Sequence, residues 1–247
     1  MAIRVKLLLV FLFISLQNDT CAEVNHAFFE KADYFFNTYV SEGHVKYDAI
    51  KKEPGLLNEI VKIIENISLE GEADLFKKAF YLNAYNILTI QQVVERYPVA
   101  GPMQVSGFFS GINHTVAGRR VTLDQLEKDL LYKQFADARL HLALVCAAKG
   151  CPPLAGFAFV PEKLDQQLDE ISELALNDDA FIRLDTKKER VYLPQIFEWY
   201  KQDFLQYAGS LLAFINQYRS RKVPDNYKIR MYDYDWSLNE VDYSSEK

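Results

Sequence analysis

Residues 74–97 carry the longest helical pattern of the chain, and this segment constrains the fold more than any other. Its apolar side chains cover most of the helix circumference instead of one stripe, so the helix must be buried on several sides. Pro98 and the Gly101-Pro102 pair end the pattern. The apolar positions are Leu75, Phe76, Ala79, Phe80, Leu82, Ile87, Ile90, Val93 and Val94.

The rest of the chain alternates helices with short strands and has no regular strand–helix–strand repeat. This order predicts an α+β fold, a single domain with the 74–97 helix packed on an antiparallel sheet. Thr122 and Gln125 form a capping-box pattern that opens one of the helices. Further helices are expected over residues 25–40, 56–67, 122–135, 162–177 and 194–218; hairpins over 114–121 and 181–193; and strands over 140–146 and 228–234.

The first 22 residues are typical of a secretory signal peptide. Two basic residues precede the apolar stretch Leu7–Leu16, and a small-residue site suits cleavage after Ala22. The stretch is too short to span a bilayer. A lipid anchor on Cys21 is the alternative, but the three residues before it lack the small and apolar character that such a site requires. We expect one domain, residues 23–247, exported to the periplasm or the extracellular space and without a membrane span.

The overall charge limits the class of partner. The chain has a net charge of −6 and no stripe of Lys and Arg, which argues against binding to nucleic acid or to anionic membranes. Hydrophobic residues make up 49% of the chain and aromatic residues 14%, enough for a well-packed core. The partner class that remains is a peptide or a small-molecule ligand.

Half of the histidines and cysteines that follow Ala22, the groups able to do nucleophilic or metal chemistry, fall in one short segment. His141, Cys146 and Cys151 lie within eleven residues. An apolar run of strand type precedes the first cysteine, and Pro152-Pro153 ends any regular element after the second. This pattern places a thiol at the edge of a sheet, where a substrate can reach it.

One interpretation is a cysteine–histidine site for acyl transfer. A reactive thiolate needs a nearby imidazole that lowers its pKa. Cys146 is the expected nucleophile and Cys151 the alternative. His114 and His141 are the candidate bases, and strand alternation would place His141 on the face opposite Cys146, which favours His114.

Two amide side chains lie on the otherwise apolar 74–97 helix. Asn83 and Asn86 are three residues apart, so they share one face, and buried amides must find hydrogen-bond partners. They either orient the catalytic imidazole or tie down the loop over residues 103–113.

The competing interpretation is a disulfide between Cys146 and Cys151, as expected for two cysteines in an oxidising compartment. Such a short loop contributes about 2 kcal/mol and fixes the turn. A zinc site from Cys146, Cys151, His141 and His114 has suitable ligand types, but the spacing matches no familiar pattern. The sequence therefore predicts no metal and no cofactor.

Seven motifs, in order, resemble the domain-of-unknown-function family numbered 547, which occurs in exported bacterial proteins and in some eukaryotic ones. The resemblance covers residues 25–239, and the family name implies no activity. The motifs are Phe80-Tyr-Leu-Asn-Ala-Tyr-Asn86, Arg96-Tyr-Pro98, Gly118 with Thr122-Leu-Asp-Gln-Leu-Glu127, Asp137-Ala-Arg-Leu-His-Leu-Ala-Leu-Val-Cys146, Gly150-Cys-Pro-Pro153, Leu193-Pro-Gln-Ile-Phe-Glu-Trp-Tyr200 and Tyr234-Asp-Trp-Ser-Leu-Asn239.

The resemblance extends, as an analogy, to papain-like and transglutaminase-like folds, which place a cysteine at the start of a central helix. Here that helix offers Asn83, so the thiol would have to come from Cys146. Two function classes follow: a thiol-dependent hydrolase or acyl transferase acting on peptide or amide bonds, and a catalytically inactive binding or scaffold domain held by a Cys146–Cys151 disulfide.

Overall fold

The structure is a computed structural model that describes residues 27–242, and it is an α+β fold in one domain. Residues 27–39 form the first helix. The other α-helices are α2 (Tyr47–Lys52), α3 (Gly55–Asn66), α4 (Asp74–Arg96), α5 (Leu123–Gln125), α6 (Leu140–Ala143), α7 (Leu164–Asn177), α8 (Ile196–Trp199), α9 (Lys201–Ala208) and α10 (Leu211–Tyr218). Two 3₁₀ turns, η1 (Pro102–Gln104) and η3 (Pro161–Lys163), and a π-helix, η2 (Leu126–Tyr132), complete the helical part.

The strands form three small sheets. β1 (Val40–Ser41) with β2 (His44–Val45), and β3 (His114–Val116) with β4 (Arg119–Val121), are antiparallel pairs. In the third sheet β5 (Arg183–Asp185) pairs antiparallel with β6 (Arg190–Pro194), and β6 pairs parallel with β7 (Lys228–Tyr232). The hairpins expected over residues 114–121 and 181–193 are therefore confirmed.

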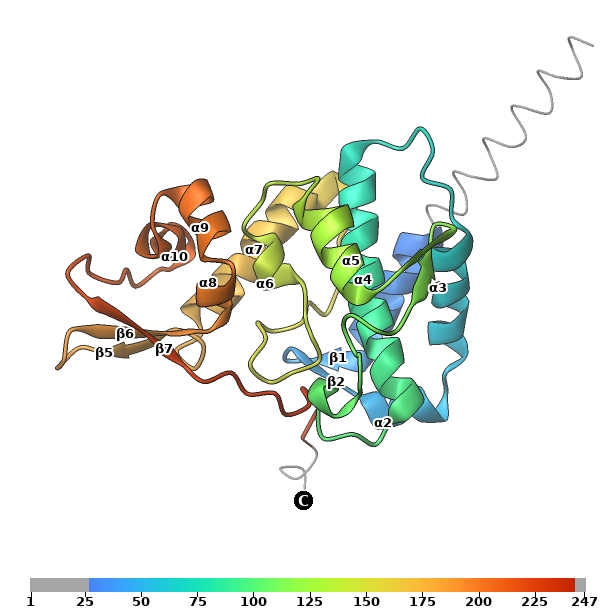
Figure 1. Cartoon of the computed structure of the whole chain (residues 1–247), viewed down its shortest axis with the longest axis horizontal. Helices are drawn as coiled ribbons and strands as arrows, with labels where there is room; N and C mark the ends of the chain where they lie inside the picture. Colours follow the sequence, from blue (N-terminus) through green and yellow to red (C-terminus); the bar gives the residue numbers. More distant parts are fainter. Residues whose placement is uncertain (1–26, 243–247) are drawn as a thin grey trace, which may run out of the picture.

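Helix α4 is the centre of the larger, helical part of the molecule. Nearly every side chain from Ala79 to Val94 is buried, as the apolar circumference predicts. Its main neighbours are α2, α3, α5, η2 and η3, whereas the three-stranded sheet lies at the far end of the molecule (Figure 1). The expectation that this helix packs on a sheet is wrong, because other helices cover its sides.

The expected strand over residues 140–146 is also wrong. Residues Leu140–Ala143 form the short helix α6, and an irregular extended segment follows. Asn86 supplies the hydrogen bonds that a neighbouring strand would have made. Its Nδ2 donates to the Ala143 carbonyl at 3.0 Å, and its Oδ1 accepts from the Val145 N–H at 2.9 Å. A short apolar run does not by itself distinguish a strand from a buried irregular segment.

The single long helix expected over residues 194–218 is three shorter helices. Tyr200 lies between α8 and α9 with φ −109° and ψ 25°. Gly209 takes φ +80°, a conformation that favours glycine, and ends α9. The Ser210 side chain then accepts from the Ala213 N–H and caps α10.

The capping box at Thr122 is confirmed. The Thr122 hydroxyl accepts from the Gln125 N–H at 3.2 Å, and the Gln125 side chain accepts from the Thr122 N–H at 2.9 Å. The helix that follows continues as the π-helix η2, a geometry that is often found at functional sites.

The segment after β7 runs back from the sheet to the helical part along one side of the molecule (Figure 1). The N–H of Gly150 donates to the Asp235 carbonyl at 2.8 Å, and the N–H of Leu238 donates to the Ala100 carbonyl at 2.8 Å. At Gly101 a Cβ would lie 2.0 Å from the Trp236 carbonyl oxygen, so only glycine permits this close approach. We call residues 233–241 the C-terminal strap.

Candidate functional site

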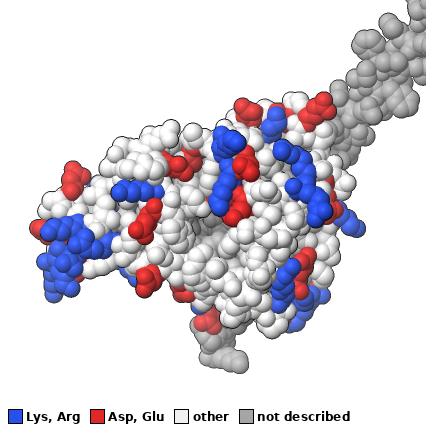
Figure 2. Space-filling view, viewed as in Figure 1, with Lys and Arg blue, Asp and Glu red and all other residues white. Residues whose placement is uncertain are grey.

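A cavity of about 310 Å³ lies where α4, η2, α6, α8 and the C-terminal strap meet. In Figure 2 the middle of the displayed face is hollowed and carries few charged side chains, in contrast to the Lys- and Arg-rich end formed by the three-stranded sheet. The residues that line the cavity are Tyr85, Phe109, Asp124, Glu127, Tyr132, His141, Leu144, Cys146, Ile196, Trp199, Tyr200, Tyr234 and Trp236.

Three rings form one wall of this cavity. The rings of Trp199 and Trp236 stack, with centroids 5.9 Å apart and an angle of 24° between their planes. The centroid of the Tyr234 ring lies 4.9 Å from that of Trp199 and 4.7 Å from that of Trp236. Trp199 is 47% exposed, so its ring is accessible from solvent. We call these residues the ring cluster.

A buried acid lines the same cavity as the rings. Glu127 in η2 is only 7% exposed, and the Tyr200 hydroxyl donates to its Oε1 at 2.5 Å. Burial raises the pKa of Glu127, and the hydrogen bond from Tyr200 opposes that rise only in part. The sequence interpretation missed this residue, although Glu127 is an acid on the same helix face as Leu123, Leu130 and Leu131, which are all buried.

His141 supports the tyrosine that binds this acid. The imidazole stacks on the Tyr200 ring with centroids 4.0 Å apart, and the Tyr132 ring lies 4.2 Å away. Burial lowers the pKa of His141 well below its usual value, in spite of the nearby Asp203 carboxylate. The ring is therefore neutral near pH 7, and its Nε2–H donates to Asp203 at 2.8 Å. Asp203 was another residue that sequence reasoning missed.

The two cysteines lie together at the edge of the cavity. Their sulfurs are at disulfide distance, and their Cα atoms are 6.4 Å apart. The Tyr234 hydroxyl lies 3.1 Å from each sulfur. Cys146 lines the cavity, whereas Cys151 is buried and lines a separate cavity. The structure thus brings together Cys146, Cys151 and His141 near one cavity, with Tyr234 as a partner that the sequence interpretation did not include.

His114 lies elsewhere, on β3 opposite Val121. Its Nε2 is buried without a hydrogen-bond partner among residues 27–242, and His114 does not line the cavity that holds Cys146. Burial, together with the positive charge of Arg96, lowers the pKa of His114 to about 4. In the described residues, the hydroxyl of Tyr234 lies against the two sulfurs at the place where the acyl-transfer interpretation expected an imidazole.

The lowered pKa of His114 predicts an acid-labile contribution to stability. In the unfolded chain His114 binds a proton below its ordinary pKa of about 6.5, whereas in the folded chain it does so only below about pH 4. The free energy of unfolding therefore falls as the pH drops from about 6.5 to about 4. His114→Gln should remove about 2 kcal/mol of this loss, as measured by urea unfolding at pH 7 and pH 4.5. Equal pH dependence in both proteins would contradict the placement of His114.

Asn83 and Asn86 both bind backbone. Asn83 Nδ2 donates to the Phe159 carbonyl at 2.7 Å, and its Oδ1 accepts from the Phe159 N–H at 3.0 Å. Asn86 binds Ala143 and Val145, and so fixes the segment that leads to Cys146. The 103–113 loop is held instead by Gln92, whose Nε2 donates to the Phe108 carbonyl at 3.0 Å; the expected link from the two asparagines to this loop is wrong.

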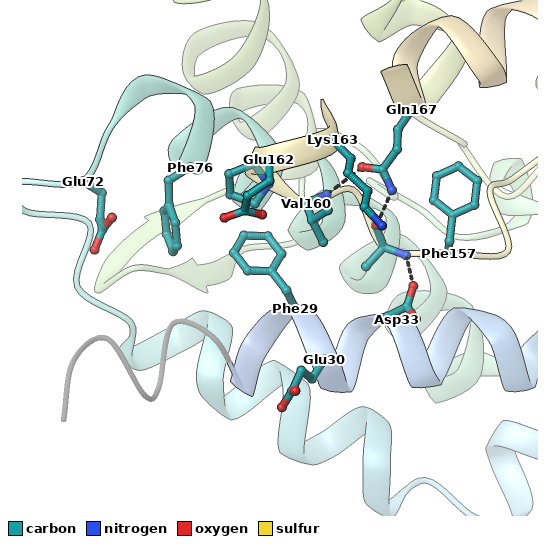
Figure 3. A pocket seen from close by; sticks show the side chains of 12 residues that line it. Phe29, Glu30, Asp33, Glu72, Phe76, Phe157, Val160, Glu162, Lys163 and Gln167 are labelled. Carbon is teal, nitrogen blue, oxygen red and sulfur yellow. Dashed lines mark hydrogen bonds between the residues drawn. The ribbon is translucent and has the colours of Figure 1, made fainter. Parts of the chain in front are cut away.

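A second, larger cavity of about 660 Å³ opens between the first helix and the 157–163 segment (Figure 3). Two of its polar side chains, Asp33 and Gln167, already serve the fold. Asp33 accepts from the Ala158 N–H at 3.0 Å, and Gln167 bonds both the Val160 N–H and the Ala158 carbonyl. Because the smaller cavity combines a buried acid, a histidine and a sulfur, we take it as the candidate site.

Two properties of the described residues bear on the expectations about metals and membranes. Over residues 27–242, no group of three or more His, Cys, Asp or Glu side chains is arranged to hold a metal ion. No helix in that range has the length and the apolar character that crossing a bilayer requires. The expected signal peptide lies outside the described residues.

Comparison with known proteins gives one match. No curated protein and no solved structure matches the chain. The sequence model of the family described as "Protein of unknown function, DUF547" matches residues 73–174. The matched segment contains Glu127, His141 and Cys146 but stops before the ring cluster. The resemblance to this family that the sequence motifs indicate is therefore confirmed over residues 73–174.

Proposed function

We propose that this domain binds a small molecule in the cavity beneath the ring cluster, and that Cys146 and Cys151 form a structural disulfide at the edge of that cavity. The observation that carries the proposal is the enclosure of one buried acid, Glu127, by aromatic rings that converge from distant parts of the chain. Such a pocket, mostly apolar and with few polar groups, is the usual form of a ligand site. We further propose that the protein is exported, since oxidising compartments favour such a disulfide.

A second function has its own support. Cys146 shares the cavity with His141 and Glu127, so reduction of the cysteine pair would release a thiol among groups that could exchange protons. The chain would then act as a thiol-dependent hydrolase or acyl transferase on a peptide or amide bond. Against it, His141 bonds Asp203 and stacks on Tyr200, and among the described residues no imidazole is hydrogen-bonded to either sulfur.

Thiol counting separates the two functions. For protein purified from the periplasm and unfolded in guanidinium, we expect no free thiol before reduction and two after it. The reduced, folded protein should react with iodoacetamide near neutral pH at the rate of an ordinary thiol. Two free thiols in untreated protein, one of them alkylated rapidly at pH 7, would favour the catalytic function.

Ligand binding itself is tested by fluorescence. Trp199 and Trp236 are the two tryptophans of the chain, and both line the cavity, so selectively excited tryptophan emission reports on this site. A panel of neutral, cationic and anionic fragments should include at least one class that changes the emission saturably. Phe76→Leu, a change in the second cavity, should leave that response unchanged. A panel in which no class binds would refute the binding function.

A further inference from the structure

The described residues that line the cavity carry acidic groups but no Lys or Arg, and this imbalance indicates the class of ligand. The described residues that line the cavity include two acids, Asp124 and Glu127, and neither Lys nor Arg. The one basic lining group is His141, and it is neutral near pH 7 because burial lowers its pKa. Asp124 pairs with Lys128 at 3.1 Å, whereas Glu127 makes no salt bridge with any described residue. The charge of nearby Lys128 favours the ionised form of Glu127, but no described Lys or Arg pairs with this buried carboxyl directly, so a cationic ligand can do so.

The aromatic rings also favour a cationic ligand. The faces of tryptophan and tyrosine rings carry negative electrostatic potential, and they attract organic cations by about 0.5–2 kcal/mol each, most strongly where water is excluded. Trp199, Tyr234 and Trp236 form one wall, and Tyr200 carries the hydroxyl that binds Glu127. An anion would meet both the ring faces and the carboxyl unfavourably.

We propose that the cavity binds a small organic cation of the quaternary-ammonium class, held between the ring cluster and the Glu127 carboxylate. This inference rests on the proposed binding function and specifies its ligand. At about 310 Å³ the cavity lies at the lower end of the size range of ligand pockets, so the cationic head must be compact. Entry of the cation replaces the missing counter-charge of Glu127 and keeps this acid ionised in a site where burial alone favours its neutral form.

The test compares a cation with an uncharged analogue of the same shape. Choline and 3,3-dimethylbutan-1-ol have nearly the same shape and differ in the charge at the branched centre. Titrated into the full-length exported protein and followed by tryptophan emission, choline should bind at least tenfold more tightly than the alcohol. Acetate and other small carboxylates should leave the emission unchanged.

Two variants test whether Glu127 and the ring cluster are the groups that bind choline. Glu127→Gln keeps an acceptor for the Tyr200 hydroxyl but removes the charge, and it should weaken choline binding at least tenfold while changing the affinity for the alcohol less than threefold. Trp199→Leu, at a position 47% exposed, should also weaken choline binding and leaves Trp236 as the reporter. Glu162→Gln, in the second cavity, is the matched control and should bind choline like the unmodified protein. Thermal unfolding of each variant confirms that it folds.

The outcomes separate this inference from the proposed function. If choline and the alcohol bind equally, or if only anions bind, the cavity is a ligand site and the preference for cations is wrong. If choline binding survives Glu127→Gln undiminished, the role of the carboxylate is wrong. If none of the three classes of fragment binds, both this inference and the proposed function are refuted.

Discussion

Replacement of Asn83 by leucine should lower the free energy of unfolding by about 4 kcal/mol. Asn83 is fully buried in α4 and makes both hydrogen bonds of the Phe159 backbone, N–H and carbonyl. Leucine has a similar shape but leaves these two buried groups without partners, at about 1–3 kcal/mol each. Urea unfolding followed by circular dichroism at pH 7 measures the loss.

The control for this change is Asn66→Leu. Asn66 is exposed and its amide bonds only the Lys62 carbonyl within the same helix, so the change should cost about 0.5 kcal/mol or less. A loss at Asn83 no larger than that at Asn66 would mean that Phe159 finds other partners, and that α4 does not hold the 157–160 segment through this amide.

Arg139→Met is expected to cost about 3 kcal/mol, because it removes the centre of a charge network that joins the start of α6 to α7. The guanidinium donates to both oxygens of Asp137 at 3.0 and 2.9 Å, and also to Asp165 at 2.7 Å and Asp169 at 2.6 Å. Asp137 is itself 90% buried, and its remaining charged partner is Lys78 at 2.6 Å. Loss of one member of a buried ion pair leaves a desolvated charge uncompensated.

Two further variants sharpen this prediction. Arg139→Lys should recover only part of the stability, because an ammonium group does not reproduce the forked donors of arginine. Lys31→Met removes an exposed pair with Glu59, at 2.9 Å, and should cost less than about 1 kcal/mol. The stability difference between the unmodified protein and Arg139→Met also depends on pH. Burial raises the pKa of Asp137, but the hydrogen bonds and charges of Arg139 and Lys78 outweigh burial and lower it, so the advantage of the unmodified protein should shrink as the pH falls below about 4. A constant difference from pH 7 to pH 3 would contradict this account.

Sequence patterns predicted those elements whose cause is local. The apolar circumference of α4, the capping box at Thr122 and the hairpin with Gly118 in its turn all depend on residues a few positions apart, and the structure confirms all three. The strand expected over 140–146 failed because its backbone bonds go to Asn86, more than fifty residues away. Nothing within the apolar run itself carries that information.

The candidate site was predicted only in part for the same reason. The segment containing His141 and Cys146 was identified, since both residues are chemically distinctive. Glu127 was missed because its role depends on aromatic residues that come much later in the sequence, chiefly Tyr200, whose hydroxyl binds it. His114 was favoured over His141 by a strand alternation that does not exist, since His141 lies on the short helix α6.

The C-terminal strap has a consequence for the order in which the protein matures. Tyr234 and Trp236 complete the cavity, and they are synthesised after every other residue that lines it. The backbones of Gly150 and Ala100 hold the strap only after it has crossed back to the helical part. Until the strap has been synthesised and has packed, the growing chain therefore has an open trough in place of an enclosed site. Closure of the cavity requires Tyr234 and Trp236, so a chain cut short before residue 234 would keep the acid and the histidine but lose the wall that encloses a ligand.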